Sequence, residues 1–313
     1  MPYSHIPVLL PEVLELLHLL PGQSVIDATL GGGGYTRALE EAVGPKGRVL
    51  AIDLDADAIE AFESRIKNQE SSKRIKVVHG NFSDIESIAE KHSFAPVSAI
   101  VADIGLSSYE LDEAGRGISF QKDEPLDMRF NAESGITASK ILADYSEEEL
   151  TNIFKLFGEE RYSAVIARNI VRNRGKAPVT MTLELTQIIS TSIPSRLQHT
   201  AQDSFRRIFQ ALRIEVNGEL KNLEKFLPVA FGLLEPGGVL AVVSFHSLED
   251  RIVKQYFQSL RGDCICPKDF PICVCGKSPQ AEVLTKKPIT AKGAELADNS
   301  RAKPAKLRAI KKL

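Results

Sequence analysis

The sequence of 313 residues has few cysteines and no long apolar run, and its net charge is close to zero. A membrane-spanning helix needs roughly 18 or more consecutive apolar residues, and no such window exists. The first residues lack the basic segment and long apolar core of a secretion signal. Four cysteines in a chain of this length do not form the disulfide framework of a small secreted domain. We therefore expect a cytoplasmic protein.

The net charge of −2, from 39 basic and 41 acidic side chains, at first argues against a nucleic-acid partner. Its distribution along the chain removes that argument. Residues 1–154 carry 13 basic and 26 acidic side chains, whereas residues 155–213 carry 10 and 4, and residues 284–313 carry 9 and 2. Two basic regions on an acidic body are typical of a protein that contacts nucleic acid, although solvated lysine and arginine faces give the same pattern.

The first hundred residues alternate short β-type runs with segments of helical period. Such alternation predicts a parallel sheet with right-handed crossovers, here a Rossmann-like, doubly wound α/β sheet. Several strands are almost entirely apolar, as expected when helices cover both faces. The predicted strands are residues 24–29, 47–53, 75–79 and 97–103, and the predicted helices are residues 35–42, 56–67 and 83–91.

The alternation stops after Asp103. Between residues 109 and 207 we predict no strand, but helices over 147–157, 159–172 and 181–190. One long helix or two abutting ones follow over residues 208–234, and a buried strand over 239–244 resumes the sheet, which residues 282–285 and 305–311 would complete. The expected domains are therefore a discontinuous α/β domain, residues 1–108 and 208–313, and an inserted all-helical domain, residues 109–207.

A glycine run and three aspartates mark a cofactor site in the predicted sheet. Residues 31–34 are all glycine and join the first strand to a helix, where the backbone can approach a ligand closely. Asp53 ends the second strand, where a carboxylate can accept ribose hydroxyls. The third glycine of a dinucleotide motif is missing, and no P-loop motif exists. Together with Asp27 and Asp103, this pattern favours S-adenosylmethionine, a cofactor that has no phosphate. The alternative is that the glycine turn binds no cofactor and serves only the packing of strand against helix.

The chain resembles the ribosomal RNA small subunit methyltransferase H (MraW) family of bacterial 16S rRNA (cytosine-N4)-methyltransferases. The resemblance implies a class I S-adenosylmethionine-dependent methyltransferase fold with a helical insertion after the fourth strand. Its matching stretches run nearly from end to end, and their order is more specific than any one of them. They are residues 5–10, 27–34, 103–108, 116–120, 125–129, 158–161, 209–214 and 244–254.

By this resemblance, S-adenosyl-L-methionine would lie against a defined set of side chains. Asp53 would bind the ribose and Phe82 would flank the adenine. Two positions depart from the family pattern, which generally has His where this chain has Tyr35 and Gln where it has Glu110; residues 203–208 depart further. Glutamate keeps a hydrogen-bond acceptor but lacks the amide donor. The implied cofactor-binding residues are Gly33, Gly34, Tyr35, Asp53, Phe82, Asp103 and Glu110.

Methyl transfer to the exocyclic amine of cytosine requires a group that accepts an amine hydrogen. The candidates are Asp103, the backbone carbonyls of residues 104–106, and His246; we favour the segment 103–108, which includes Ser107. His246 has a structural alternative, in which residues 244–250 only cap a helix, with Ser247 as N-cap and Asp250 three residues later. A C5 mechanism would need a cysteine nucleophile in the sheet, and every cysteine lies between residues 264 and 275.

We therefore expect methylation of the N4 amine of a cytidine in 16S rRNA of the small ribosomal subunit, in the decoding region. Alternatives are another RNA or a DNA cytosine, or a non-catalytic ribosome assembly factor. Cys264, Cys266, Cys273 and Cys275 would either bind zinc or remain reduced. The apolar residues of 208–234 could contribute to the face of a homodimer. The basic side chains expected to hold RNA phosphates are those of the tail and Arg161, Arg168, Arg172, Arg174, Lys176, Arg206 and Arg207.

Overall fold

The computed structural model describes residues 7–105, 115–262, 278–299 and 302–313. The chain divides into two compact units, Met1–Gly105 with Leu220–Leu313, and Leu106–Glu219. The boundary expected between residues 207 and 208 falls inside helix α10 (Ala201–Asn217), which belongs wholly to the second unit. The helical period alone could not locate that boundary, because α10 begins seven residues before the predicted helix.

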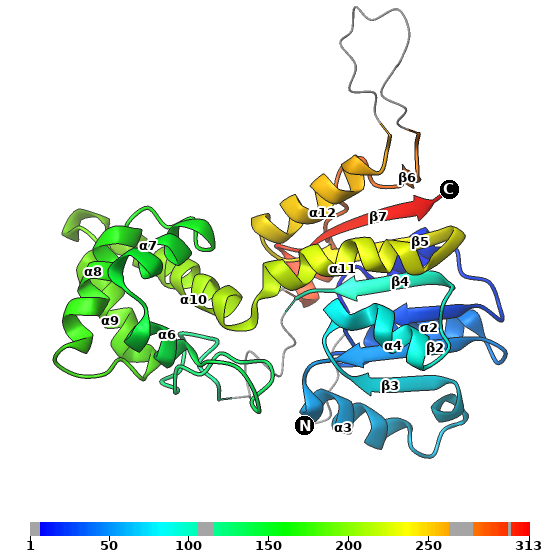
Figure 1. Cartoon of the computed structure of the whole chain (residues 1–313), viewed down its shortest axis with the longest axis horizontal. Helices are drawn as coiled ribbons and strands as arrows, with labels where there is room; N and C mark the ends of the chain where they lie inside the picture. The colour runs from blue at the N-terminus through cyan, green and yellow to red at the C-terminus, as the bar shows by residue number, and fades with distance from the viewer. Residues whose placement is uncertain (1–6, 106–114, 263–277, 300–301) are drawn as a thin grey trace, which may run out of the picture. The chain divides into compact units, whose positions relative to one another are not determined.

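The first unit is built on a seven-stranded sheet in the order β3-β2-β1-β4-β5-β7-β6 (Figure 1). The strands from β3 to β5 are parallel, and β7 runs antiparallel to both β5 and β6. This arrangement confirms the doubly wound α/β sheet and is that of a class I methyltransferase fold. The strands are β1 (Ser24–Asp27), β2 (Arg48–Asp53), β3 (Ile75–His79), β4 (Val97–Asp103), β5 (Leu234–Ser244), β6 (Ala281–Val283) and β7 (Lys306–Lys312).

Helices cover both faces of this sheet, as its apolar strands predict. Successive strand residues point to opposite faces, so Val25 packs in one apolar cluster and Ile26 in the other. The cluster around Val25 includes α1 (Leu10–Leu17), α2 (Gly34–Val43) and α3 (Ala56–Ile66). The cluster around Ile26 includes α4 (Ile85–Lys91), α11 (Glu219–Leu233) and α12 (Ser247–Ser259). Short elements complete the unit: η1 (Glu70–Lys73), η2 (Phe82–Asp84) and α13 (Ala294–Asp298).

The second unit has its own apolar core, and its described residues from 138 onward are mainly helical. Residues 115–207 contain one isolated bridge, between Pro125 and Met181, and no strand. Three predicted helices are confirmed, whereas the short helix α6 and the 3-10 turn η3 were not predicted. The elements before α10 are α6 (Ala138–Asp144), α7 (Glu147–Leu156), α8 (Ser163–Arg174), α9 (Thr182–Ser192) and η3 (Ser195–Thr200).

The long helical segment after residue 200 is two helices. Gly218 ends α10 in the left-handed conformation, with φ of 61°, and its N–H donates to the carbonyl of Ile214. The apolar residues of α10 and α11 are buried inside their own units, for example Leu212 and Phe226. These buried side chains are not available to a second copy of the chain, and the homodimer stays a prediction.

None of the described helices is long and apolar enough to cross a membrane. Ser107, Glu110 and the four cysteines lie outside the described residues.

Candidate active site

Three aspartates end three neighbouring strands of the sheet. Asp53 closes β2, Asp27 closes β1 and Asp103 closes β4, and these strands are adjacent and parallel. Parallel strands present their carboxyl ends at one edge, so the three carboxyl groups gather there. Ligands of open α/β sheets bind outside this edge, at the point where the strand order reverses. Here the order reverses at β1 and β4, the strands that carry Asp27 and Asp103.

The glycine run forms the turn between β1 and α2. Gly31 and Gly33 both have positive φ, 47° and 76°, which favours glycine at each position. A Cβ at Gly33 would lie 2.1 Å from Cδ2 of the buried Phe62, whereas a Cβ at Gly31 would meet no heavy atom within 4 Å. The guanidinium of Arg65 donates to the carbonyl of Gly32 at 2.9 Å. Helix α3 therefore packs against the turn at Gly33, while the side of Gly31 is open.

Asp53 links the glycine turn to the start of α3. Its Oδ2 accepts the N–H of Gly31 at 2.7 Å, and its Oδ1 accepts the N–H of Asp55 at 2.8 Å. Burial nevertheless raises the pKa of Asp53 to about 6, against the lowering effect of these backbone donors. A carboxylate oxygen has two lone pairs, so both oxygens can accept a further hydroxyl hydrogen. The geometry is compatible with the predicted ribose contact.

Asp27 is fully buried behind the turn. Its Oδ2 accepts the Thr36 hydroxyl at 2.6 Å, and its Oδ1 accepts the N–H of Thr29 at 3.2 Å. Burial raises the pKa of Asp27 to about 7 despite these donors, and the nearby charges of Asp103 and Asp53 add to the rise. Asp27 therefore fixes the conformation of the β1 end and of α2 from within the protein.

Asp103 carries a carboxylate oxygen with no hydrogen-bond partner among the described residues. This atom, Oδ1, is buried. Burial raises the pKa of Asp103 to about 7, a backbone hydrogen bond from Gly105 lowers it, and the charge of Glu249 raises it further. Leaving such an oxygen unpaired costs on the order of 1–3 kcal/mol, so Asp103 is suited to accept a hydrogen from a bound molecule.

The chemistry of this edge fits S-adenosylmethionine better than a dinucleotide. When ionised, the carboxyl groups of Asp53 and Asp103 would repel the pyrophosphate of a dinucleotide and attract the positive sulfonium and ammonium groups of S-adenosylmethionine. The open side of Gly31 supplies a surface for such a ligand, and Oδ1 of Asp103, to which no described residue donates, supplies an acceptor.

The aromatic residues predicted to bind the cofactor occupy different environments. Phe82 begins η2 after β3, is partly exposed, and packs edge-on against Phe226 with ring centroids 5.2 Å apart. Tyr35 is 3% exposed, and its hydroxyl donates to the carbonyl of Val8. Burial raises the pKa of the Tyr35 hydroxyl. The Tyr35 side chain thus anchors the N-terminal segment, and its predicted role in cofactor binding remains a prediction, as do those of the other predicted site residues.

His246 is the N-cap of α12. Its Nδ1 accepts the N–H of Glu249 at 3.3 Å, and Oε2 of Glu249 accepts the N–H of His246 at 3.1 Å. The predicted capping motif exists, but the prediction of Ser247 as N-cap with Asp250 is wrong by one residue. An acceptor Nδ1 places the proton of a neutral imidazole on Nε2, which lies 3.1 Å from Oε1 of Glu249.

Several residues that organise this edge were not predicted. The N–H of Asp103 donates to the Thr29 hydroxyl at 2.7 Å, which joins the ends of β4 and β1. A Cβ at Gly105 would lie 2.3 Å from the Phe245 ring, so the segments after β4 and β5 are in close contact. Glu249 is 3% exposed. Of these residues, only Thr29 could have been suspected from the sequence, because it lies two residues after Asp27. The other contacts depend on tertiary packing.

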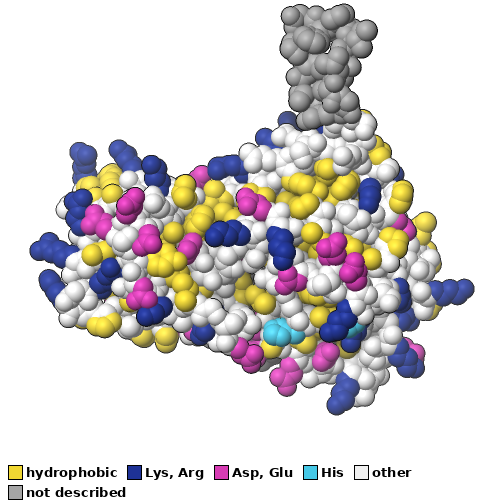
Figure 2. Space-filling view, in the orientation of Figure 1, with side chains coloured by type: hydrophobic (Ala, Val, Ile, Leu, Met, Phe, Trp, Pro, Cys, Tyr) yellow, Lys and Arg dark blue, Asp and Glu magenta, His cyan; other side chains and the backbone are white. Residues whose placement is uncertain are grey.

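The basic side chains of the second unit divide into two groups. Arg174 donates to the carbonyls of Leu142 and Tyr145, so its guanidinium has a structural role. Acidic partners are also present for three others: Arg168 with Glu147, Arg206 with Asp203, and Arg207 with Glu160. Arg161, Arg172 and Lys176 are exposed and have no acidic partner in the described part of the chain. Figure 2 shows lysine and arginine side chains along the outer edge of this unit, with acidic ones between them.

A family model described as the MraW methylase family matches residues 2–313. The chain is 45% identical over 313 residues to ribosomal RNA small subunit methyltransferase H of Clostridium botulinum (strain Loch Maree / Type A3), with 100% of each chain covered. It is 44% identical over 314 residues to the protein of the same name from Heliobacterium modesticaldum (strain ATCC 51547 / Ice1), again with 100% of each covered. A solved structure of an rRNA methylase from Streptococcus thermophilus is 10% identical, with a TM-score of 0.44 and 99% of each chain covered. The chain belongs to the MraW methylase family and is a methyltransferase that uses S-adenosylmethionine.

Proposed function

We propose that this protein methylates the N4 amine of a cytidine in 16S rRNA, in the decoding region of the small ribosomal subunit. The names of its relatives support the small-subunit RNA as substrate. The observation that carries the reaction is the buried Oδ1 of Asp103 at the carboxyl end of β4, which has no hydrogen-bond partner among the residues that the structure describes. S-adenosylmethionine supplies the electrophilic methyl group when bound, and the protein has to supply orientation and a hydrogen acceptor. Such an enzyme acts in the cytoplasm.

Asp103 suits the acceptor role because the amine of cytosine is a weak nucleophile. Its lone pair is delocalised into the ring, and an acceptor that binds one amine hydrogen localises that pair and takes the proton as the methyl transfers. A carboxyl group with a pKa of about 7 is ionised in a large fraction of molecules near neutral pH and can accept that proton. Holding amine and acceptor together accounts for most of the expected acceleration.

His246 is less suited to accept the proton. Its Nδ1 already accepts the N–H of Glu249, so the neutral ring presents a donor rather than an acceptor at Nε2. We propose that His246 orients the start of α12, and that Asp103 together with the following segment, including Ser107, contacts the base.

Methylation at nitrogen is favoured over methylation at C5. A C5 enzyme forms a covalent bond between cysteine and the base. No strand of the sheet contains a cysteine, because all four lie between residues 264 and 275.

We propose that the helical unit, with residues 109–207 as its expected extent, contacts the RNA through α8. Arg168 and Arg172 are four residues apart and therefore neighbours on its exposed side. Arg161 precedes the helix and Lys176 follows it. Each side chain that neutralises a phosphate makes log K depend more steeply on log salt by about 0.9. Replacing Arg161, Arg168 and Arg172 by Gln should thus reduce that slope for small-subunit binding by about 2–3; replacing Lys46, Lys67 and Lys91 instead should not.

The decisive experiment is methyl transfer to small subunits from cells that lack this enzyme, followed by nucleoside mass spectrometry. N4-methylcytidine is the expected product. Formation of 5-methylcytidine would contradict the amine mechanism. Cofactor binding without any methylated product would favour a non-catalytic assembly factor, and a product only on other nucleic acids would contradict the substrate.

A further inference from the structure

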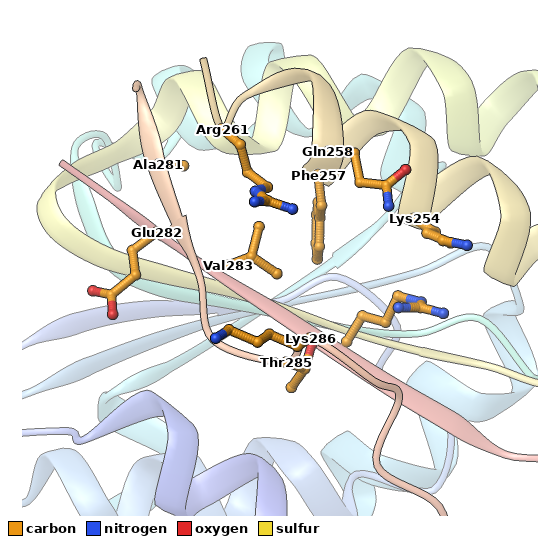
Figure 3. Close-up of a pocket in the computed structure, with 10 residues that line it drawn as sticks. Lys254, Phe257, Gln258, Arg261, Ala281, Glu282, Val283, Thr285 and Lys286 are labelled. Carbon is orange, nitrogen blue, oxygen red and sulfur yellow. The ribbon is translucent and has the colours of Figure 1, made fainter. Parts of the chain in front are cut away.

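A basic cavity lies on the first unit between α12 and the last two strands (Figure 3). Its volume is about 530 Å³, within the range of roughly 300–1,000 Å³ that holds small ligands or parts of larger ones. The lining comes from α12 and from Arg261, two residues after its end, from β6 and the residues after it, and from β7. None of the lining residues belongs to the edge of the sheet where Asp27, Asp53 and Asp103 end their strands.

The lining has an excess of positive charge. Lys254, Arg261, Lys286 and Arg308 contribute cations, and Glu282 is the one acidic residue among the lining residues. Glu282 lies between Ala281 and Val283, which pack toward α12, so its side chain projects to the other side of the strand. Figure 3 shows the Glu282 carboxylate pointing away from Phe257 and Val283.

The charges of two lining lysines are not neutralised by any residue that the structure describes. Lys254 and Lys286 are exposed and have no acidic partner among the described residues. Arg308 differs, because its Nε donates to Oδ1 of Asp250 at 2.6 Å and its side chain is 8% exposed. Arg308 is thus part of the wall, and the lysines are available to a ligand.

The walls of this cavity are already fixed. The N–H groups of Gln280 and Ala281 both donate to the carbonyl of Leu260, which ties the start of β6 to the end of α12. Asp250 ties the start of α12 to β7 through Arg308 and Lys306. Phe257, 2% exposed, lies behind the opening. A preformed site loses little entropy when it binds.

We propose that this cavity binds the phosphate backbone of the RNA substrate at a point away from the methylated base. The lysines come from separate elements, one on α12 and one after β6, so each can pair with a different phosphate of an extended polyanion. The C-terminal stretch 284–313, which supplies Lys286 and Arg308, carries 9 basic and 2 acidic side chains. The inference rests on the proposed function, since it takes RNA as the substrate. The contact anchors the RNA and carries no base specificity, because phosphates are alike at every position.

The test compares Lys254→Gln/Lys286→Gln with a control, Lys67→Gln/Lys91→Gln, that removes the same charge from exposed positions of the same unit. Binding to small subunits and to protein-free 16S rRNA is measured over a range of KCl concentrations. Each lost phosphate contact should reduce the slope of log K against log salt by about 1, hence about 2 for the cavity variant and none for the control. The variant Lys254→Arg/Lys286→Arg should keep the wild-type slope.

An unchanged slope in the cavity variant, or an equal loss in the control, would overturn the proposal. Weaker binding to subunits with unchanged binding to free rRNA would assign the cavity to a ribosomal protein and also overturn it. The proposal would also be overturned if the cavity variant lost binding of AMP or inorganic phosphate but bound RNA as the wild type does. Methyl transfer by the wild type is measured on the same subunits, so a failure of the proposed function would show as a missing product, independently of these slopes.

Discussion

The contact between Gly33 and Phe62 leads to a quantitative prediction for Gly33→Ala. Two costs add at this position. An L-residue in the left-handed conformation, here φ of 76°, costs about 1–2 kcal/mol. The new methyl would overlap the fully buried Phe62 ring at 2.1 Å, and overpacking a core costs about 1–3 kcal/mol. We expect Gly33→Ala to lower the free energy of unfolding by about 2–5 kcal/mol.

Gly31→Ala is the matched control, because Gly31 also has positive φ but a Cβ at this position would meet no heavy atom within 4 Å. It should lose only the backbone term, about 1–2 kcal/mol. Urea unfolding followed by circular dichroism gives both values. In a double-mutant cycle, Phe62→Leu should reduce the cost of Gly33→Ala, because the shorter side chain makes room for the methyl. The reasoning is refuted if Gly33→Ala costs no more than Gly31→Ala, or if the cycle shows no coupling with Phe62.

Three further predictions concern the titratable groups. Asp103→Asn should lower kcat/KM for methyl transfer by about 10²–10⁴-fold and abolish the rise of the rate with pH near 7, since an amide accepts no proton. If the pH–rate profile of Asp103→Asn keeps the acid limb of the wild type, Asp103 is not the acceptor. Burial raises the folded-state pKa of Asp27 to about 7, so folding takes up a proton between pH 4 and 7, and stability falls as pH rises through that range. From pH 8 to pH 5, the wild type should therefore gain about 2–3 kcal/mol more stability than Asp27→Asn in urea unfolding. Equal gains in the two proteins would contradict the raised pKa. His246→Asn should retain both stability and activity because asparagine is a good N-cap, whereas His246→Ala should lower the free energy of unfolding by about 1 kcal/mol. A His246→Asn variant that is stable but inactive would show that the imidazole takes part in the reaction.

The sheet could be predicted because its strands carry local signals. Short apolar runs identify three strands, and alternation with helices fixes their parallel direction. Two of them end in Asp53 and Asp103 as predicted, whereas the first was predicted to run to residue 29 and ends at Asp27. The position of the carboxylates at one edge follows from that direction alone. Their raised pKa values could not be predicted, because burial depends on which residues from elsewhere in the chain cover them. The cap of α12 shows the same limit, since His246 and Ser247 both precede an acidic residue by three positions and only the backbone geometry selects His246.

Charge counting has a similar limit in the helical unit. The excess of basic residues between 155 and 213 marks a region, and every arginine in it counts equally. The contacts separate them: Arg174 binds the carbonyls of Leu142 and Tyr145 at the end of α6, groups that a helix end leaves unpaired. Arg172, two residues earlier, is exposed and has no acidic partner in the described part of the chain. Replacement of Arg174 should therefore destabilise this unit, whereas replacement of Arg172 should change RNA binding alone. A basic region in a sequence thus identifies candidate residues, and their side-chain partners in the structure separate the structural ones from those that can bind RNA.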